Sequence, residues 1–151
     1  EKIGKNPQQV YKTLVAQGSS KEIYVYVISV KDELDIKKAS KSVGEKKIDM
    51  IPVKDLLKHT GYVRGGCSPI GMKKKYVTVV DEKAVEQETI IFSAGKIGSQ
   101  VEMKPENLID ISKASFQDIV KWLIEKIIKV CMKKRRDIRR RRQNETMLRR
   151  N

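Results

Sequence analysis

Six consecutive apolar residues, Ile23 to Ile28, limit the folds open to this chain more than any other feature of its sequence. All six are strand formers, and apolar and polar residues do not alternate among them. A strand that is apolar on both sides must be covered on both sides, as at the centre of a sheet between two layers. We therefore predict a central strand at 22–30. It should form a hairpin with the β-rich run 10–17 across the polar residues 18–21.

The rest of the first 119 residues mixes predicted helices with predicted strands. Helices are expected where an acid, a proline or a glycine marks a start or a stop, at 32–43, at 52–59 and from Pro105 onward. In the second helix, Leu56 and Leu57 should face inward. Further strands are expected at 47–51, 76–80, 89–93 and 100–103. These elements predict one mixed α/β (α+β) domain with about six strands and flanking helices, a size for which 151 residues suffice.

The net charge of +14 is concentrated at the C-terminal end. Residues 1–118 carry a net charge of +4, whereas residues 119–151 carry +10. Apolar spacing predicts a long helix from Phe116 to Met132, followed by a basic continuation over 133–142. Charges this dense favour an exposed helix or a disordered arm over a place in the core. No apolar run approaches the ~20 residues that a bilayer span needs, so we expect no stable membrane insertion.

Few residues could serve in the common catalytic arrangements. His59 is the only histidine, and at the end of a predicted helix it is more typical of a partner for the helix dipole than of a catalytic base. Cys67 could act as a nucleophile, but only Arg64 and a lysine run stand near it in sequence to lower its pKa. One histidine and two cysteines exclude the usual zinc clusters, and so few cysteines favour a reducing compartment.

The segment 61–71 contains four glycines and a proline, yet it matches neither the Walker A motif nor the dinucleotide fingerprint. Without a Cβ, Gly65 and Gly66 can bring their amides close to a ligand; a tight turn is the alternative. The lysines 73–75 would place three cations beside a phosphate, although they could also be a solvated strand end. Lys12 stands at an otherwise apolar strand start, either as a ligand-binding residue or as an edge residue that reaches solvent.

Four segments taken together resemble the YbaK/EbsC family of aminoacyl-tRNA deacylases: 11–15 (YKTLV), 34–39 (LDIKKA), 60–74 (TGYVRGGCSPIGMKK) and 89–96 (TIIFSAGK). The likeness covers residues 1–119, which we take as the deacylase domain, with an N-terminal part of the family pattern expected to be missing. Residues 120–151 would be a C-terminal extension. Three interpretations of it stay open: a helix that grips RNA, a basic helix on a membrane surface, and the product of a shifted reading frame.

The resemblance implies a free-standing editing enzyme on the fold of the editing domain of bacterial prolyl-tRNA synthetases. It implies catalytic roles for Lys12, Gly65 and Ser93. Substrate contacts would come from Gly66, Ser68, Pro69 and Gln100, and tRNA contacts from Lys73, Lys74 and Lys75. Gln100 departs from the family, which often has an acidic residue at that position.

The resemblance also implies the chemistry. The substrate is Cys-tRNA(Pro), whose own thiol attacks the ester, so neither a protein nucleophile, a metal nor a cofactor is expected. The partners would be the acceptor end of tRNA(Pro) and prolyl-tRNA synthetase, in the cytoplasm. The alternative is a tRNA-binding module or synthetase partner that has lost hydrolysis.

Overall fold

The computed structural model describes residues 7–150, apart from the side chains of 123–126. By internal contacts the chain divides after Val120 into two units, which we describe separately. The first unit contains the sheets and all helices except α4, which is Leu123–Arg149.

The main sheet has five strands in the order β3-β1-β2-β4-β7. The strands of this sheet are β1 (Tyr11–Gly18), β2 (Ile23–Ser29), β3 (Ile48–Met50), β4 (Val77–Asp81) and β7 (Ser115–Gln117). The hairpin β1–β2 is antiparallel, whereas β4 runs parallel to both β2 and β7, so the sheet is mixed. All seven residues of β2 are buried at its centre, as the unbroken apolar run predicts. A second, antiparallel sheet pairs β5 (Ile90–Ser93) with β6 (Gln100–Met103).

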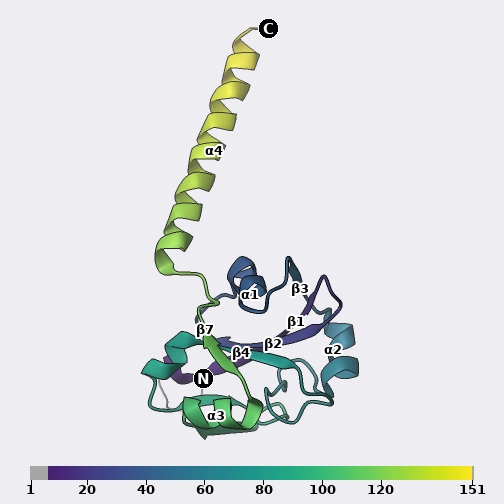
Figure 1. Cartoon of the computed structure of the whole chain (residues 1–151). Coiled ribbons are helices and arrows are strands. Elements are labelled where there is room, and N and C mark those ends of the chain that lie inside the picture. Colours follow the sequence, from purple (N-terminus) through teal and green to yellow (C-terminus); the bar gives the residue numbers. More distant parts are fainter. Residues whose placement is uncertain (1–6, 151) are drawn as a thin grey trace. The chain divides into compact units, whose positions relative to one another are not determined.

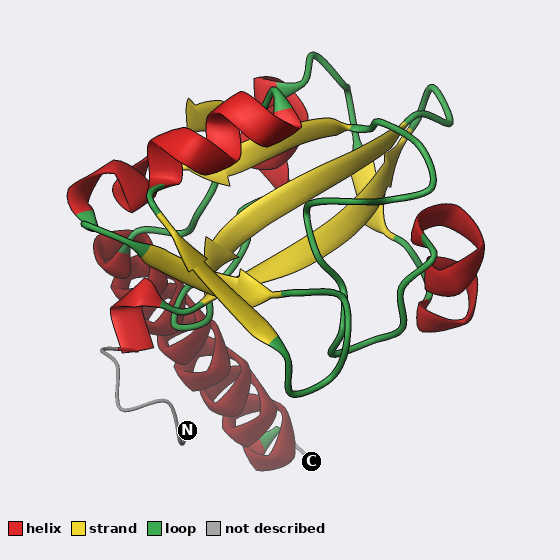
Figure 2. Ribbon diagram, turned by 90° about the horizontal axis from the view of Figure 1, so that it is seen from below, coloured by secondary structure: helices red, strands yellow, loops and turns green. Residues whose placement is uncertain are grey.

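Helices cover both faces of the main sheet (Figure 1 and Figure 2), which confirms the predicted α+β class. On one face α1 (Ile36–Ser42) packs through Ala39 against Tyr26 and Ile28. On the other, α3 (Pro105–Ser112) and the β5–β6 sheet pack through Leu108 and Phe92. A third cluster joins β1 and β2 to the glycine-rich segment and to the partly buried Leu56 of α2 (Val53–Thr60). Two short 3-10 helices, Pro7–Gln9 and Glu82–Glu86, complete the unit.

Two details of the predicted helices were wrong. The first helix begins at Ile36 and not near 32, because the side chain of Asp35 accepts the backbone N–H groups of Lys37 and Lys38. In the second helix Leu57 is 53% exposed and does not face inward. That helix ends as predicted, at Gly61 in the left-handed conformation with φ 86°.

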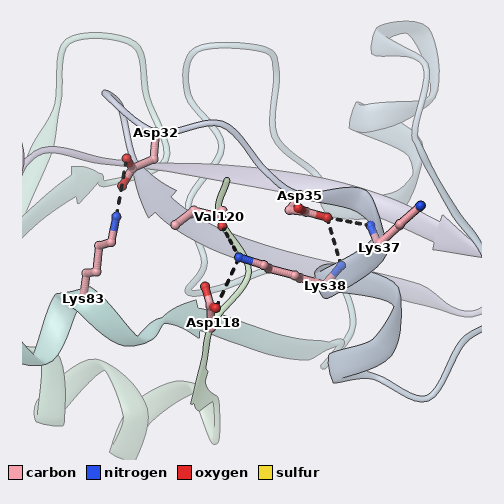
Figure 3. A network of polar contacts seen from close by, with 7 residues as sticks. All are labelled: Asp32, Asp35, Lys37, Lys38, Lys83, Asp118 and Val120. Carbon is pink, nitrogen blue, oxygen red and sulfur yellow. Dashed lines mark hydrogen bonds and ion pairs between the residues drawn. The ribbon is translucent and has the colours of Figure 1, made fainter. Parts of the chain in front are cut away.

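The predicted helix from Phe116 to Met132 was also wrong over its first seven residues, because α4 begins at Leu123. Residues 115–117 form β7, and Phe116 pairs with Val80. Figure 3 shows how the next residues are fixed to α1: the ammonium of Lys38 lies 3.3 Å from an oxygen of Asp118 and donates to the carbonyl of Val120 at 3.1 Å. Ile119 and Val120 are fully buried, so their apolar spacing reflects the core of the first unit and not a helix face.

In the second unit, every described side chain of α4 from 127 to 149 is exposed. None of the helices in the described part of the chain is long and apolar enough to cross a membrane.

Candidate active site

Three of the predicted site residues lie in one row across adjacent strands. A parallel bridge joins Val10 to Ile91, so β5 runs alongside the start of β1. Two residues beyond that bridge on each strand are Lys12 and Ser93, which therefore occupy corresponding positions. Ser93 in turn pairs with Gln100 of β6. The strand register thus brings a lysine, a serine and a glutamine, which the sequence separates by up to 88 positions, to neighbouring backbone positions.

The backbone of Lys12 is fixed in the sheet, whereas its ammonium group has no ion-pair partner among the described side chains. It lies opposite Ile28 in the β1–β2 ladder, on the same side of the strand as Leu14, and is half-buried. No carboxylate whose side chain is described forms an ion pair with its ammonium. A half-buried cation without a partner is suited to binding an anionic group of a ligand.

The glycine-rich segment packs against the turn that follows Ser93. A Cβ added to Gly66 would lie 3.3 Å from the backbone nitrogen of Ile97 and 3.5 Å from the carbonyl oxygen of Gly95. Gly65 has φ 85°, a conformation that other residues rarely adopt. The predicted close approach at these two glycines is therefore made, in this structure, to the chain's own β5–β6 turn. It fixes Gly65 and Gly66 next to the row.

Tyr62 contacts both the glycine-rich segment and the turn that follows β5. Its hydroxyl donates to the carbonyl of Ile70 at 2.5 Å, and a Cβ on Gly95 would come within 3.0 Å of its ring. At the end of β5, the hydroxyl of Ser93 accepts the N–H of Gly95 at 3.3 Å, which leaves its proton for another acceptor.

Ser68 and Pro69, both predicted to contact substrate, are buried. The hydroxyl of Ser68 accepts the N–H of Ile70 at 3.3 Å. A buried side chain engaged in this way holds the shape of the segment. Any contact of Ser68 with a ligand would therefore use the backbone.

Thr13 is a candidate that the sequence analysis missed. It lies opposite Val27, on the other side of β1 from Lys12, and shares that side with Val15, which packs against Cys67. Its hydroxyl oxygen is buried and has no hydrogen-bond partner among the described residues. A buried hydroxyl without a partner is costly, so a role in binding a ligand is a natural explanation. Only the strand register reveals it.

The two conventional catalytic residues do not have the properties of a nucleophile and base. Burial raises the pKa of the Cys67 thiol to about 11, although a hydrogen bond with Thr60 opposes the shift. The thiol is therefore protonated at neutral pH. His59 lies in the last turn of α2, as predicted, and its carbonyl accepts the hydroxyl of Tyr76 at 2.6 Å.

The predicted tRNA-binding lysines lie on the far side of the glycine-rich segment. All three are exposed, and two of them, Lys74 and Lys75, line a cavity of about 430 Å³ that begins at Pro69. Neither Lys12 nor Ser93 lines that cavity. The candidate residues thus form two groups, with the segment 66–69 between them.

The described part of the chain is thus an α+β domain in which Lys12, Ser93 and the glycine-rich segment are brought to neighbouring places by the strand register and by the β5–β6 turn. The chain matches the model of the aminoacyl-tRNA editing domain over residues 1–111. It belongs to this family, and the resemblance seen in its motifs is confirmed.

One curated relative agrees with this assignment, and two solved structures share the fold. The chain is 44% identical over 119 residues to the Enterococcus faecalis (strain ATCC 700802 / V583) protein named "Putative Cys-tRNA(Pro)/Cys-tRNA(Cys) deacylase EbsC", covering 79% of this chain and 73% of that one. The fold is similar to a crystal structure described as a "putative trans-editing enzyme for prolyl tRNA synthetase", with a TM-score of 0.72 and 24% identity over 80% of this chain and 75% of the other. A scaffold protein used for epitope backbone grafting by computational design gives a TM-score of 0.75 at 24% identity, over 80% and 77% of the two chains.

Proposed function

We propose that this protein deacylates mischarged Cys-tRNA(Pro), with the thiol of the attached cysteine as the nucleophile. One observation carries the proposal: the row of Lys12, Ser93 and Gln100 lies beside the glycine-rich segment, while Cys67 of that segment is buried and protonated. Such a site is suited to holding a substrate that brings its own nucleophile. The relative from Enterococcus faecalis, whose name includes this activity, supports the choice of substrate.

The proposed reaction has two steps. The substrate thiol loses its proton and attacks the carbonyl carbon of its own ester; a sulfur–carbon bond forms, and the bond from that carbon to the ribose oxygen breaks. The ribose oxygen takes up a proton, which frees the tRNA. Water then opens the cyclic thioester and gives free cysteine.

The protein's part in this reaction is to position and polarise the substrate. Holding thiol and carbonyl in reacting geometry can lower the barrier by about 7–11 kcal/mol. The N–H of Gly66 already donates to the carbonyl of Val63 at 3.0 Å, so the backbone N–H of the exposed Gly65 would be the donor to the developing oxyanion, where one donor is worth about 3–4 kcal/mol. Lys12 would bind a phosphate of the terminal nucleotide, and Ser93 would donate a hydrogen bond from its hydroxyl.

This mechanism explains how correct and incorrect products would be told apart. Prolyl esters carry no thiol, so they would survive even when bound. Alanyl esters would have to be attacked by water and would be cleaved slowly.

Gln100 favours a second candidate, a tRNA-binding module that works with prolyl-tRNA synthetase. The amide stands opposite Ser93, where the resemblance leads us to expect an acid. An amide cannot act as a base, so a step that needs the acid would be lost while binding remained.

Deacylation assays with the full chain separate the two candidates. We expect Cys-tRNA(Pro) to be hydrolysed at least 100-fold faster than Ala-tRNA(Pro). The binding affinities of the two esters should differ by less than 100-fold. Tight binding of both esters without hydrolysis of either would reject the deacylase and support the binding module.

The basic extension fits the same substrate. We propose that α4 contacts RNA phosphates, since residues 133–142 contain eight basic side chains and one acidic one and are all exposed. Action in the cytoplasm, where tRNA is charged, is part of this proposal.

A further inference from the structure

The cavity of about 430 Å³ beside the glycine-rich segment has no role in the reaction proposed above. Its walls are residues 69–78 on one side and the C-terminal end of α3 on the other. Apolar side chains line it, among them Ile70, Met72 and Tyr76, and three lysines complete the lining: Lys74, Lys75 and Lys113. Its volume lies within the range of sites for small organic groups.

Lys113 is unusual in its backbone conformation. It caps α3 with φ 58°, and its N–H donates to the carbonyl of Ile109 at 2.8 Å. Glycine is the residue most often found at this position, because a Cβ is disfavoured there. Here the chain keeps a long cationic side chain at the edge of the cavity instead.

This combination matches the chemistry of a nucleotide. A base can stack on apolar and aromatic side chains, and lysines can pair with the phosphates on either side of it. The cavity is open and carries three cations but no acidic side chain in its lining. An apolar ligand without charge would leave those cations unused.

The position of the cavity indicates which part of the tRNA would supply this nucleotide. The segment from Gly66, at the candidate active site, to Pro69, at the cavity, is three residues long and spans at most about 10 Å. The nucleotide before the last residue of a single-stranded RNA bound at the active site can therefore reach the cavity.

We propose that this cavity binds a nucleotide of the single-stranded 3′ end of tRNA, upstream of the terminal adenosine. The inference rests on the proposed function and adds a second point of attachment for the same substrate. The cavity would then contribute to affinity for tRNA and not to the chemical step.

The test compares two substrates of the full chain: Cys-tRNA(Pro) and the cysteinyl ester of adenosine, which has no upstream nucleotide. The informative variant is Lys113→Gly, because glycine preserves the cap and relieves the left-handed conformation while it removes the ammonium. Lys113→Arg keeps the charge. Lys104→Gln is the matched control, since Lys104 is an exposed lysine at the opposite end of α3 whose side chain makes no cap.

We expect Lys113→Gly to raise KM for Cys-tRNA(Pro) about 5–10-fold with kcat unchanged, and to leave both constants for the adenosine ester unchanged. Lys113→Arg and Lys104→Gln should behave like the parent chain. Equal effects of Lys113→Gly on both substrates, or no effect on either, would overturn the inference.

Binding of uncharged tRNA keeps this test separate from the deacylase proposal. If neither ester is cleaved, the deacylase proposal fails, and binding then decides the inference alone. Lys113→Gly should weaken binding of intact tRNA about fivefold and should not change binding of tRNA trimmed of its last three nucleotides. The same loss with both RNAs, or no loss, would reject the cavity as a nucleotide site.

Discussion

Ile119 and Ile138 show how differently the two units of this chain are built. Ile119 is fully buried in a cluster that joins the main sheet to α1, whereas Ile138, in α4, is 44% exposed. In the first unit, burial of apolar surface stabilises the folded structure. In α4 the described side chains bury nothing comparable, so its helix depends on local preferences alone.

Charge reinforces the difference. In α4, Arg135 and Arg139 stand four residues apart on one helix face, as do Arg136 and Arg140. Like charges at this spacing destabilise a helix by a few tenths of a kcal/mol for each pair. Asp137 can offset only part of this repulsion. The first unit is therefore stabilised by its own core. A ligand that neutralises the arginines of α4 would stabilise that helix.

The largest expected effect concerns catalysis, which we propose for the first unit. Lys12→Ala should lower the rate of Cys-tRNA(Pro) hydrolysis at least 1,000-fold, or about 4 kcal/mol of transition-state stabilisation, because the ammonium that binds the substrate is lost. Lys134→Ala removes a lysine of α4 and should leave the single-turnover rate within twofold. Equal rates for the parent chain and Lys12→Ala would remove Lys12 from the site.

A second prediction concerns stability. Ile119→Ala should lower the free energy of unfolding of the first unit by about 2–5 kcal/mol, since it leaves a cavity in the core. Ile138→Ala should change it by less than about 0.5 kcal/mol. Urea denaturation followed by the near-UV signal of the buried tyrosines measures both. Similar losses for the two variants would contradict the division between the units.

Asp81 gives the first unit a dependence on pH. It is fully buried, and burial, together with the nearby Asp32 and Asp118, raises its pKa from 3.8 to about 6, against the opposing effects of Lys83 and the backbone of Ile119. Because the pKa is higher in the folded state, the folded protein retains a proton that the unfolded chain loses between about pH 4 and 6. The contribution of Asp81 to stability is therefore lost as pH rises through this window.

Asp81→Asn isolates this contribution. Relative to the variant, the parent chain should lose about 2–3 kcal/mol of unfolding free energy between pH 4 and 7. The helical signal of α4 has no reason to follow the same curve. A constant difference between the two chains across this range would show that Asp81 does not titrate as its surroundings indicate.

The smallest expected effect concerns the proposed RNA contact of α4. Changing Arg139, Arg140, Arg141 and Arg142 to glutamine in the full chain should reduce the slope of log affinity for tRNA against log salt by up to about 3, because each phosphate contact contributes about 0.7–0.9. A matched variant with four exposed lysines of the first unit changed, Lys21, Lys46, Lys54 and Lys58, should alter the slope less. An unchanged slope in the arginine variant would exclude RNA contact and leave the membrane-surface and reading-frame interpretations.

Much of the fold could be predicted because its signals are local. The apolar run at 23–28 gave the central strand, and Gly61 gave the end of α2. The predicted helix boundaries were wrong where one local pattern was compatible with two structures. Asp32 and Asp35 are both acids before a helical pattern, and only hydrogen bonds show that Asp35 is the cap. The spacing of Phe116, Ile119 and Val120 fits a helix, but each is placed by contacts with distant residues.

The candidate site was predictable in part. Resemblance to a family supplied the candidate residues, but neither composition nor spacing could show that Lys12 and Ser93 come to corresponding positions, since that depends on how β5 lies beside β1. Thr13 was missed for the same reason: its orphan hydroxyl is visible only after the sheet is built. Gln100 stays a departure whose effect only an assay can measure.

The central claim is that the substrate supplies the nucleophile and the protein supplies its position. The most direct measurement is the rate at which the full chain cleaves S-methylcysteinyl-tRNA(Pro), with competition against Cys-tRNA(Pro) as the measure of its binding. We predict that the methylated ester competes for the site and is not cleaved, because its sulfur can no longer attack. Cleavage of the methylated ester at a rate close to that of the cysteinyl ester would contradict the account, since water or a protein group would then be the nucleophile.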